Sequence, residues 1–336
     1  MNLDQIYQPI ANDLKKVEHL LELSVRESKN QSIQAMSDSL LESGGKRLRP
    51  ALVILSEKAA SIDKNSNCTH TPTHDNLITL ATAVELIHMA SLIHDDVLDG
   101  ATMRRGKPSV NARLGDNVSI VFGDYVYSKA FELIGKCRNP DVFECISQAI
   151  YVMCEGELTQ ICQRGNLDLS KDNYIVIVRK KTASLFAACC HAGAILGDHS
   201  QAVQSTLKEF GLNFGIAFQI IDDCKDIISE GRVLGKHPGQ DVAVGDMTLP
   251  LLNLLDVVGP SEKEELKKLL QFTPDKNCLK EIRKMFIETE ALSSTQKTAL
   301  YYIDCAKNRL NGLKNSDYKR SLCHLTDYVT NNFLIL

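Results

Sequence analysis

The sequence predicts an all-α protein of ten or more helices, and three observations support this fold class. Apolar residues recur at helical spacing nearly throughout, alternating patterns typical of strands are scarce, and helix-breaking residues arrive at intervals. With 336 residues, of which 44% are hydrophobic, the chain can bury a substantial core. Because no low-complexity linker divides it, we expect one helical bundle domain over residues 1–336.

The helical pattern can be followed in order along the chain. The first segment carries Ile10, Leu14, Val17 and Leu21 at helical spacing, and the fourth carries Val84, His88, Ser91 and Asp95 in the same way. Breaks between helices are expected at Gly44-Gly45, at Gly106-Lys107-Pro108, at residues 231–239 and at Gly259-Pro260.

A polar stretch at about residues 61–76 predicts a surface loop. It contains Cys68, His70 and His74, which are residue types that bind metals. Three ligands in one loop lack a fourth ligand and a rigid scaffold, so we favour a loop without metal.

Charge and cysteine content limit the classes of partner. The 38 basic and 42 acidic residues give a formal charge of −4 without a long basic run, so we expect small-molecule ligands and no nucleic acid. Eleven cysteines without paired spacing, and no secretory signal, indicate a reducing compartment. The cytoplasm is expected, with the plastid stroma as the alternative. No apolar run approaches about 18 residues, which predicts no membrane-spanning segment.

Two copies of one acidic pattern are the strongest functional signal. They are Asp95-Asp96-x-x-Asp99 and Asp222-Asp223-x-x-Asp226, each within an apolar stretch that we interpret as helix. Residues four apart share a helix face, so like charges gather there and call for a cation. Carboxylates are ligands that Mg²⁺ takes while leaving positions for water and substrate phosphates. One copy would fit a solvated helix face equally well, but two copies predict a two-sided, metal-held diphosphate site.

Cations accompany the acidic patterns. Arg104 and Arg105 follow the first pattern, where Gly100 and Gly106 indicate that the helix ends. The planar arginine fork matches phosphate oxygens, although the pair could instead cap the helix. Upstream, Lys46 and Arg49 follow a Gly-Gly turn whose backbone amides can approach an anion.

The chain resembles the trans (E-type) polyprenyl diphosphate synthases from about residue 5 to its C-terminus. GGKRLRP, ELIHMASLIHDDVLD with the following RR, KTASLF, and GIAFQIIDDCKD with its downstream GK occur in the family's order. The resemblance implies the isoprenoid synthase fold, a helical bundle around a deep central cavity. It also implies Mg²⁺-dependent head-to-tail condensation of isopentenyl diphosphate with an allylic diphosphate, in a homodimer that contacts membranes transiently to release its product.

The resemblance also implies roles for individual residues. The six aspartates Asp95, Asp96, Asp99, Asp222, Asp223 and Asp226 would hold three Mg²⁺ ions. Lys181 and Lys236, with Arg104, would bind the allylic diphosphate. The diphosphate of isopentenyl diphosphate would be bound by Lys46, Arg49, His88 and Arg105. Thr182 and Gln219 would direct polar groups at the developing cation.

Two of these positions carry a qualification. His88 lies two helical turns before Asp95 on nearly the same face, but a lone histidine on an apolar face also fits a core residue. Asp246 stands where many relatives carry a lysine, and we leave it outside the site because an acid would oppose anion binding.

Three alternatives to a long-chain polyprenyl diphosphate synthase are open. A terpene cyclase or head-to-head condensing enzyme also ionises diphosphates, but GGKRLRP and the second acidic pattern argue against it. A non-catalytic subunit of a heteromeric synthase would be expected to lose some of the six aspartates. A geranylgeranyl diphosphate synthase differs only in product length.

Product length depends on the residues before the first acidic pattern. Relatives that stop at fifteen carbons, and some that stop at twenty, place Phe or Tyr where this chain has Ala90 and Ser91. The next floors are Ile87 and Val84, at about 5.4 Å of depth per turn. The resemblance therefore predicts products longer than twenty carbons, in the hexaprenyl to nonaprenyl range. The alternative is that Ala90 and Ser91 are small because two helices pack closely there.

Overall fold

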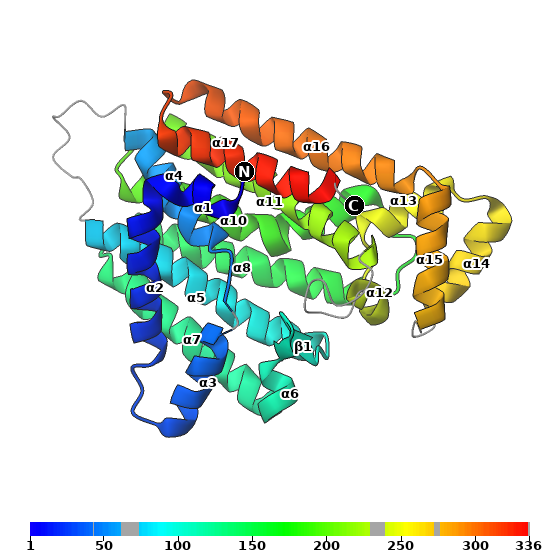
Figure 1. The fold of residues 1–336 in the computed structure, drawn as a ribbon, viewed down its shortest axis with the longest axis horizontal. Coiled ribbons are helices and arrows are strands. Elements are labelled where there is room, and N and C mark those ends of the chain that lie inside the picture. Colours follow the sequence, from blue (N-terminus) through cyan, green and yellow to red (C-terminus); the bar gives the residue numbers. More distant parts are fainter. Residues whose placement is uncertain (43, 62–73, 229–238, 272–275, 335–336) are drawn as a thin grey trace.

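The computed structural model describes residues 1–42, 44–61, 74–228, 239–271 and 276–334, and these are almost entirely helical (Figure 1). The helices are α1 (Leu3–Tyr7), α2 (Ala11–Val25), α3 (Gln31–Glu42), α4 (Leu48–Ser61), α5 (His74–Leu98), α6 (Val110–Leu114), α7 (Asp116–Lys136), α8 (Pro140–Cys162), α9 (Lys171–Val178), α10 (Ser184–Leu196), α11 (Gln201–Ile228), α12 (Gln240–Val244), α13 (Leu249–Val257), α14 (Pro260–Gln271), α15 (Lys276–Glu288), α16 (Ala291–Arg309) and α17 (Asp317–Leu334). One small antiparallel hairpin joins β1 (Met103–Arg104) to β2 (Lys107–Pro108). The predicted all-α fold of ten or more helices is confirmed.

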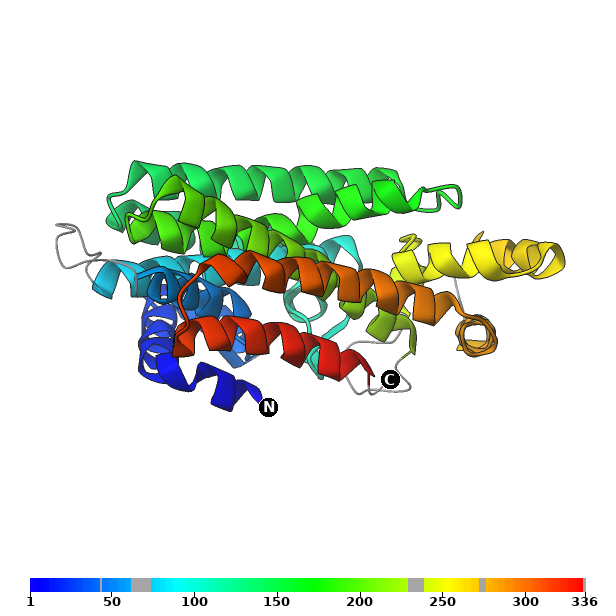
Figure 2. The same cartoon turned by 90° about the horizontal axis from the view of Figure 1, so that it is seen from above.

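The long helices α5, α10 and α11 form the centre of the bundle. Helix α5 packs against α4 and α7, and α10 packs against α4, α8 and α11. Three fully buried rings, Phe186, Phe210 and Phe214, stack where α10 meets α11. The two views agree that α14 and α15 lie at one end of the molecule, beyond the ends of α5 and α8 (Figures 1 and 2). The apolar core therefore runs through the long helices and leaves their ends for polar groups.

Helix α5 corrects one expectation from the sequence. The helix is long and apolar enough to cross a membrane, and 72% of its most apolar window is buried inside the protein. Its apolarity matches its position between α4 and α7 in the core. Residues 74–98 are therefore more apolar than the sequence analysis allowed, and their burial is that of a core helix.

The expected breaks coincide with ends of helices. Gly44-Gly45 precedes α4, Gly106-Lys107-Pro108 forms the hairpin, and Gly259-Pro260 begins α14. Most of the polar stretch, with Cys68 and His70, lies outside the described residues, as do residues 231–238. Ser61 ends α4, while residues 74–76 form the first turn of α5, where His74 Nε2 lies 3.2 Å from Asp13 Oδ1. The ten described cysteines are all free thiols.

Candidate active site

The two acidic patterns meet at one pocket. Helix α5 ends at the first pattern and α11 carries the second pattern in its last two turns. Asp99 and Asp223 line the same pocket, together with Lys181, Asp241 and Asp246. The structure thus brings together two acidic groups that are far apart in the sequence, as a two-sided site requires.

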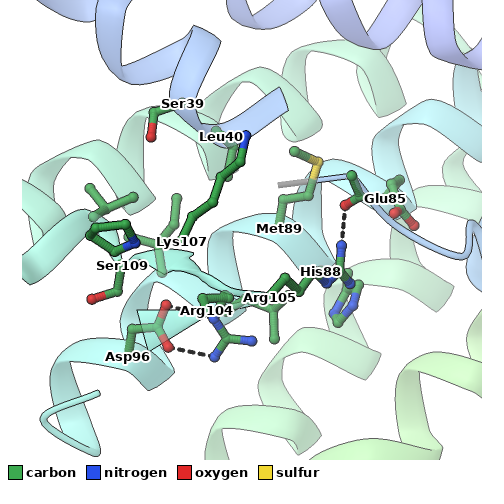
Figure 3. Close-up of a pocket in the computed structure, with 15 residues that line it drawn as sticks. Ser39, Leu40, Glu85, His88, Met89, Asp96, Arg104, Arg105, Lys107 and Ser109 are labelled. Carbon is green, nitrogen blue, oxygen red and sulfur yellow. Dashed lines mark hydrogen bonds and ion pairs between the residues drawn. The ribbon is translucent and has the colours of Figure 1, made fainter. Parts of the chain in front are cut away.

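Each aspartate of the first pattern has a cation nearby. Asp96 is only 2% exposed and accepts two hydrogen bonds from Arg104, at 2.6 and 2.5 Å (Figure 3). Asp99 Oδ1 lies 2.7 Å from a guanidinium nitrogen of Arg164. Burial raises the pKa of Asp95 to about 6, and the charge of Lys181 opposes that rise. The first pattern is therefore largely neutralised by the protein itself.

The hairpin after α5 directs its two arginines apart. Arg105 and Gly106 have φ angles of 51° and 79°, the positive values that a tight two-residue hairpin turn requires. Arg104 faces Asp96, whereas Arg105 extends away toward His88 and Glu85 (Figure 3). Arg105 also donates to the Gly44 carbonyl. Arg104 binds the side-chain carboxylate of Asp96, and Arg105 binds a carbonyl outside α5. These contacts do not fit a helix cap, which would bind the carbonyl groups at the end of α5.

A second pocket lies beside the first, between α5, the hairpin and the Gly44 turn. Its lining includes Glu85, His88, Arg104 and Arg105 (Figure 3). Burial and the nearby arginines, first of all Arg49, lower the pKa of His88 well below its ordinary value. The imidazole is therefore neutral at pH 7 and can donate one hydrogen bond.

One cation of the GGKRLRP segment is engaged in ion pairs, and within the described residues two others are not. Arg47 is held by Glu18 and by Glu85, the latter at 2.9 Å, and is therefore committed to ion pairs. Arg49 stacks on Phe186 at 4.5 Å, and its Nε has no hydrogen-bond partner within the described residues. Lys46 is exposed, with its ammonium 5.7 Å from the Tyr328 ring. Arg49 and Lys46 are therefore the two cations of this segment that an anion can recruit.

Asp223, the buried aspartate of the second acidic pattern, is held by neutral donors. Asp223 is 4% exposed and accepts from Tyr174 Oη at 2.5 Å and from Gln219 Nε2 at 2.7 Å. Gln219 in turn accepts from Thr182 Oγ1 at 2.8 Å. Burial raises the pKa of Asp223 to about 7. Thr182 and Gln219, predicted to face the developing cation, thus belong to one hydrogen-bond chain that ends at Asp223.

The other two aspartates of α11 are more accessible. Asp222 is exposed, and within the described part of the chain it forms no hydrogen bond or ion pair. Asp226 accepts from the backbone N–H of Asp241 at 3.1 Å. Burial, and then the negative charge of Asp226, raise the pKa of Asp241 well above its ordinary value. Asp241 adds a seventh carboxyl group that the sequence reasoning missed.

Lys181 owes its position to an irregular turn. Residues Arg179–Ala183 form a π-helical turn between α9 and α10, a feature that often marks functional sites. A Cβ at Gly156 would lie 2.3 Å from the Lys181 backbone nitrogen, so only glycine permits this close approach of α8. Lys181 pairs with Glu157 at 2.6 Å, and charges that include Glu157 and Asp95 raise its pKa despite burial.

The sequence analysis placed two further residues, Lys236 and Asp246, and missed three others near the pocket. Lys236 lies outside the described residues. Asp246, which the sequence reasoning left outside the site, lies in the pocket with Asp99 and is 6% exposed. Sequence reasoning missed Glu157 on α8, Arg164 just beyond α8, and Tyr174 on α9, because no acidic pattern marks these segments.

The donor set fits a divalent metal shared with substrate phosphates. Within the described residues, no three acidic, histidine or cysteine side chains converge closely enough to hold an ion alone. The pocket lining includes four aspartates, whose carboxylate oxygens are hard ligands, namely Asp99, Asp223, Asp241 and Asp246. Mg²⁺ is commonly bound by one or two carboxylates plus water and phosphate oxygens, so this arrangement suits it.

The candidate length-determining residues lie on α5, before the first acidic pattern. Val84, Ile87 and Ala90 are fully buried. Ser91 is half-buried, and its hydroxyl donates to the His88 carbonyl at 2.9 Å. Ser91 is therefore the member of this set that still borders accessible space.

Comparison with known proteins is consistent along the whole chain. A family model described as polyprenyl synthetase matches residues 30–288. The chain is 34% identical over 331 residues to the short chain isoprenyl diphosphate synthase of Methanothermobacter thermautotrophicus, covering 95% of this chain and 98% of that protein. It is 30% identical over 325 residues to the octaprenyl diphosphate synthase of Escherichia coli, covering 97% of both.

Solved structures agree with these sequence matches. The polyprenyl synthase of Caulobacter crescentus, in complex with calcium and isoprenyl diphosphate, has a TM-score of 0.90 at 32% identity, covering 99% of this chain and 98% of that one. A decaprenyl diphosphate synthase from Rhodobacter capsulatus has a TM-score of 0.88 at 29% identity, covering 99% of both chains. The chain therefore belongs to the polyprenyl synthetase family and is a prenyltransferase that makes prenyl diphosphates.

Proposed function

We propose that this prenyltransferase condenses isopentenyl diphosphate head to tail with an allylic diphosphate and extends the product beyond twenty carbons. The observation that carries the proposal is the shared pocket of Asp99 and Asp223, with Lys181 in its wall and Arg104 on Asp96. Three Mg²⁺ ions, held by the six aspartates, would bind the allylic diphosphate there and stabilise it as it departs.

The chain's own residues supply the remaining electrostatics. Arg104 and Lys181 add positive charge on the diphosphate side, while Thr182 and Gln219 present dipoles to the allylic carbon as it becomes cationic. In the neighbouring pocket, Arg105 and neutral His88 bind the second diphosphate and aim the isopentenyl double bond at that carbon, and Arg49, whose charge acts on His88, adds positive charge nearby. The released pyrophosphate takes the proton that the new product loses.

We also propose a homodimer, formed through α7 and α8. These helices expose large apolar side chains that a solitary protein would be expected to bury, namely Val121, Phe131, Phe143, Tyr151 and Leu158. The rings of Phe131 and Phe143 lie 6.3 Å apart, so the exposed side chains join across the two helices. Light scattering after gel filtration tests this: Val121→Asp should give monomers, whereas Ile287→Asp, an exposed control on α15, should not.

The function is tested by product analysis on the chain purified alone. Labelled isopentenyl diphosphate is incubated with dimethylallyl, geranyl or farnesyl diphosphate, with Mg²⁺ or with EDTA, and products are separated by length. We expect products beyond twenty carbons with Mg²⁺ and none with EDTA. Products that stop at twenty carbons would indicate a geranylgeranyl diphosphate synthase. No product with any primer would indicate a non-catalytic subunit.

A further inference from the structure

Arg164, the second residue beyond the end of α8, joins two carboxylates of the pocket. Its Nη2 lies 2.7 Å from Asp99 Oδ1, and its Nε lies 3.0 Å from Asp246 Oδ1. The other carboxylate oxygen of Asp246 accepts from Gln160 Nε2 at 2.6 Å. The three charged side chains are 21%, 20% and 6% exposed in the order Arg164, Asp99, Asp246, so solvent screens this bridge only partly.

The backbone around the bridge is also tied together. Gly165 N–H donates to the Gly245 carbonyl at 2.8 Å, which docks the end of α8 onto the turn before α13. Gln240 Nε2 donates to the Asp99 carbonyl at 2.9 Å, and Asp246 N–H donates to the Asp241 carbonyl at 2.8 Å. Hydrogen bonds therefore connect the three segments that carry Asp99, Arg164 and Asp246.

Arg164 offsets the repulsion between the carboxylates of Asp99 and Asp246. Burial raises the pKa of Asp246, the charge of Arg164 opposes this most strongly, and the nearby Asp99 adds to the rise. Without the guanidinium, two carboxylates would face one another in a half-buried site. A lysine could not replace it fully, because one ammonium lacks the planar fork that reaches two carboxylates at fixed angles.

We propose that Arg164 is a positioning residue for the first acidic pattern, and that Asp246 acts through it. Asp246 fixes the guanidinium, and the guanidinium holds Oδ1 of Asp99, so that Oδ2 is presented to the pocket. The acid at position 246 is then neutralised by a cation just beyond the end of α8 rather than opposing the diphosphate. This inference rests on the proposed function of the pocket.

The test measures binding apart from turnover. A non-reactive allylic thiodiphosphate is titrated calorimetrically in Mg²⁺ into the wild type, Arg164→Ala, Arg164→Lys, Asp246→Asn and the double variant Arg164→Ala/Asp246→Asn. Unfolding temperatures are recorded in EDTA. Lys307→Ala, which removes an ion pair of 2.6 Å between α16 and α17 whose residues do not line the pocket, is the control.

We expect Arg164→Ala to weaken binding about 10- to 100-fold, the usual effect of removing a partner of a metal-binding group. Arg164→Lys and Asp246→Asn should weaken it less, the double variant should bind no worse than Arg164→Ala, and Lys307→Ala should bind like the wild type. Binding within about twofold of wild type in Arg164→Ala would overturn the proposal, even if its unfolding temperature fell. So would additive losses in the double variant.

The experiment distinguishes failure of the proposed function from failure of the role of Arg164. If Arg164→Ala does not fold, unchanged binding in both Arg164→Lys and Asp246→Asn overturns the proposal. If the wild type makes no product and binds no analogue, the proposed function fails. If the wild type is active but insensitive to these changes, only the role of Arg164 fails.

Discussion

The two acidic patterns have the same sequence form but opposite electrostatic settings. At the end of α5, Asp96 is bound by Arg104 and Asp99 by Arg164. On α11, Asp223 is bound by the neutral groups of Tyr174 and Gln219. Two acids of the first pattern are therefore paired with cations, whereas Asp223 is held by neutral donors and lies beside Asp222 and Asp226, whose charges add to the rise of its pKa. The two copies of the pattern therefore differ in how the protein itself compensates the charge of their buried aspartates.

The largest expected effects come from removing one acid of each pattern. Asp96→Ala and Asp222→Ala should each lower kcat by about 10³-fold or more, because diphosphate stabilisation in the transition state is lost. The two variants should differ in how their unfolding temperatures change. Asp96→Ala leaves Arg104 without its buried partner and lowers the unfolding temperature measured in EDTA. Asp222→Ala removes an exposed acid from a like-charged group and leaves that temperature unchanged or higher.

Thermal unfolding by circular dichroism, with steady-state assays in Mg²⁺, checks both halves of this prediction. The proposed division between the two patterns fails if the two variants lose stability equally. It also fails if either folded variant keeps near-normal turnover.

A second pair of variants compares the partners rather than the acids. Arg104→Ala strands a buried carboxylate and should cost about 3–5 kcal/mol of stability. Tyr174→Phe removes one hydrogen bond from a carboxylate that keeps Gln219, and should cost about 1–3 kcal/mol. Urea unfolding in EDTA gives both free energies. A larger loss for Tyr174→Phe would show that the neutral donors, and not the arginine, are the stronger support.

A smaller effect is expected from the cations around the second pocket. Lys46→Ala and Arg105→Ala should raise KM for isopentenyl diphosphate about 10- to 100-fold, with little change for the allylic substrate, because each removes charge-assisted contacts to one diphosphate only. Initial rates with each substrate varied in turn measure the difference. Equal increases for both substrates would mean that the two diphosphate sites have been confused.

The sequence was most informative where chemistry repeats along one helix. Helical spacing predicted the bundle, and the two acidic patterns pointed to groups that do share a pocket. Spacing could not reveal that Arg164, Glu157 and Asp246 lie near them, since ends of separate helices converge only after packing. The position of Asp246 could not be predicted for the same reason: its ion pair with Arg164 joins residues 82 positions apart in the sequence.

The two patterns also differ in the residue that lies one helical turn before each of them in the sequence. Four residues before Asp95 stands Ser91, and four residues before Asp222 stands Phe218, whose ring packs 5.2 Å from Phe186. The residue one turn before the second pattern is thus aromatic and packed against the core, whereas the residue one turn before the first pattern is small. A growing chain would extend on the α5 side.

Ser91→Phe should therefore shorten the product to about twenty carbons or fewer while turnover is retained, the smallest effect on rate in this series. Ser91 is half-buried, so a ring there can project into accessible space, while Ala90 is fully buried and Ala90→Phe should mainly lose stability through overpacking. Chromatography of the products, with unfolding temperatures for both variants, separates the two effects. Phe218→Leu on the opposite wall should leave product length unchanged. If Ser91→Phe lost stability and kept the wild-type product, Ser91 would be a packing residue, and the end of the chain would have to be set elsewhere in the bundle.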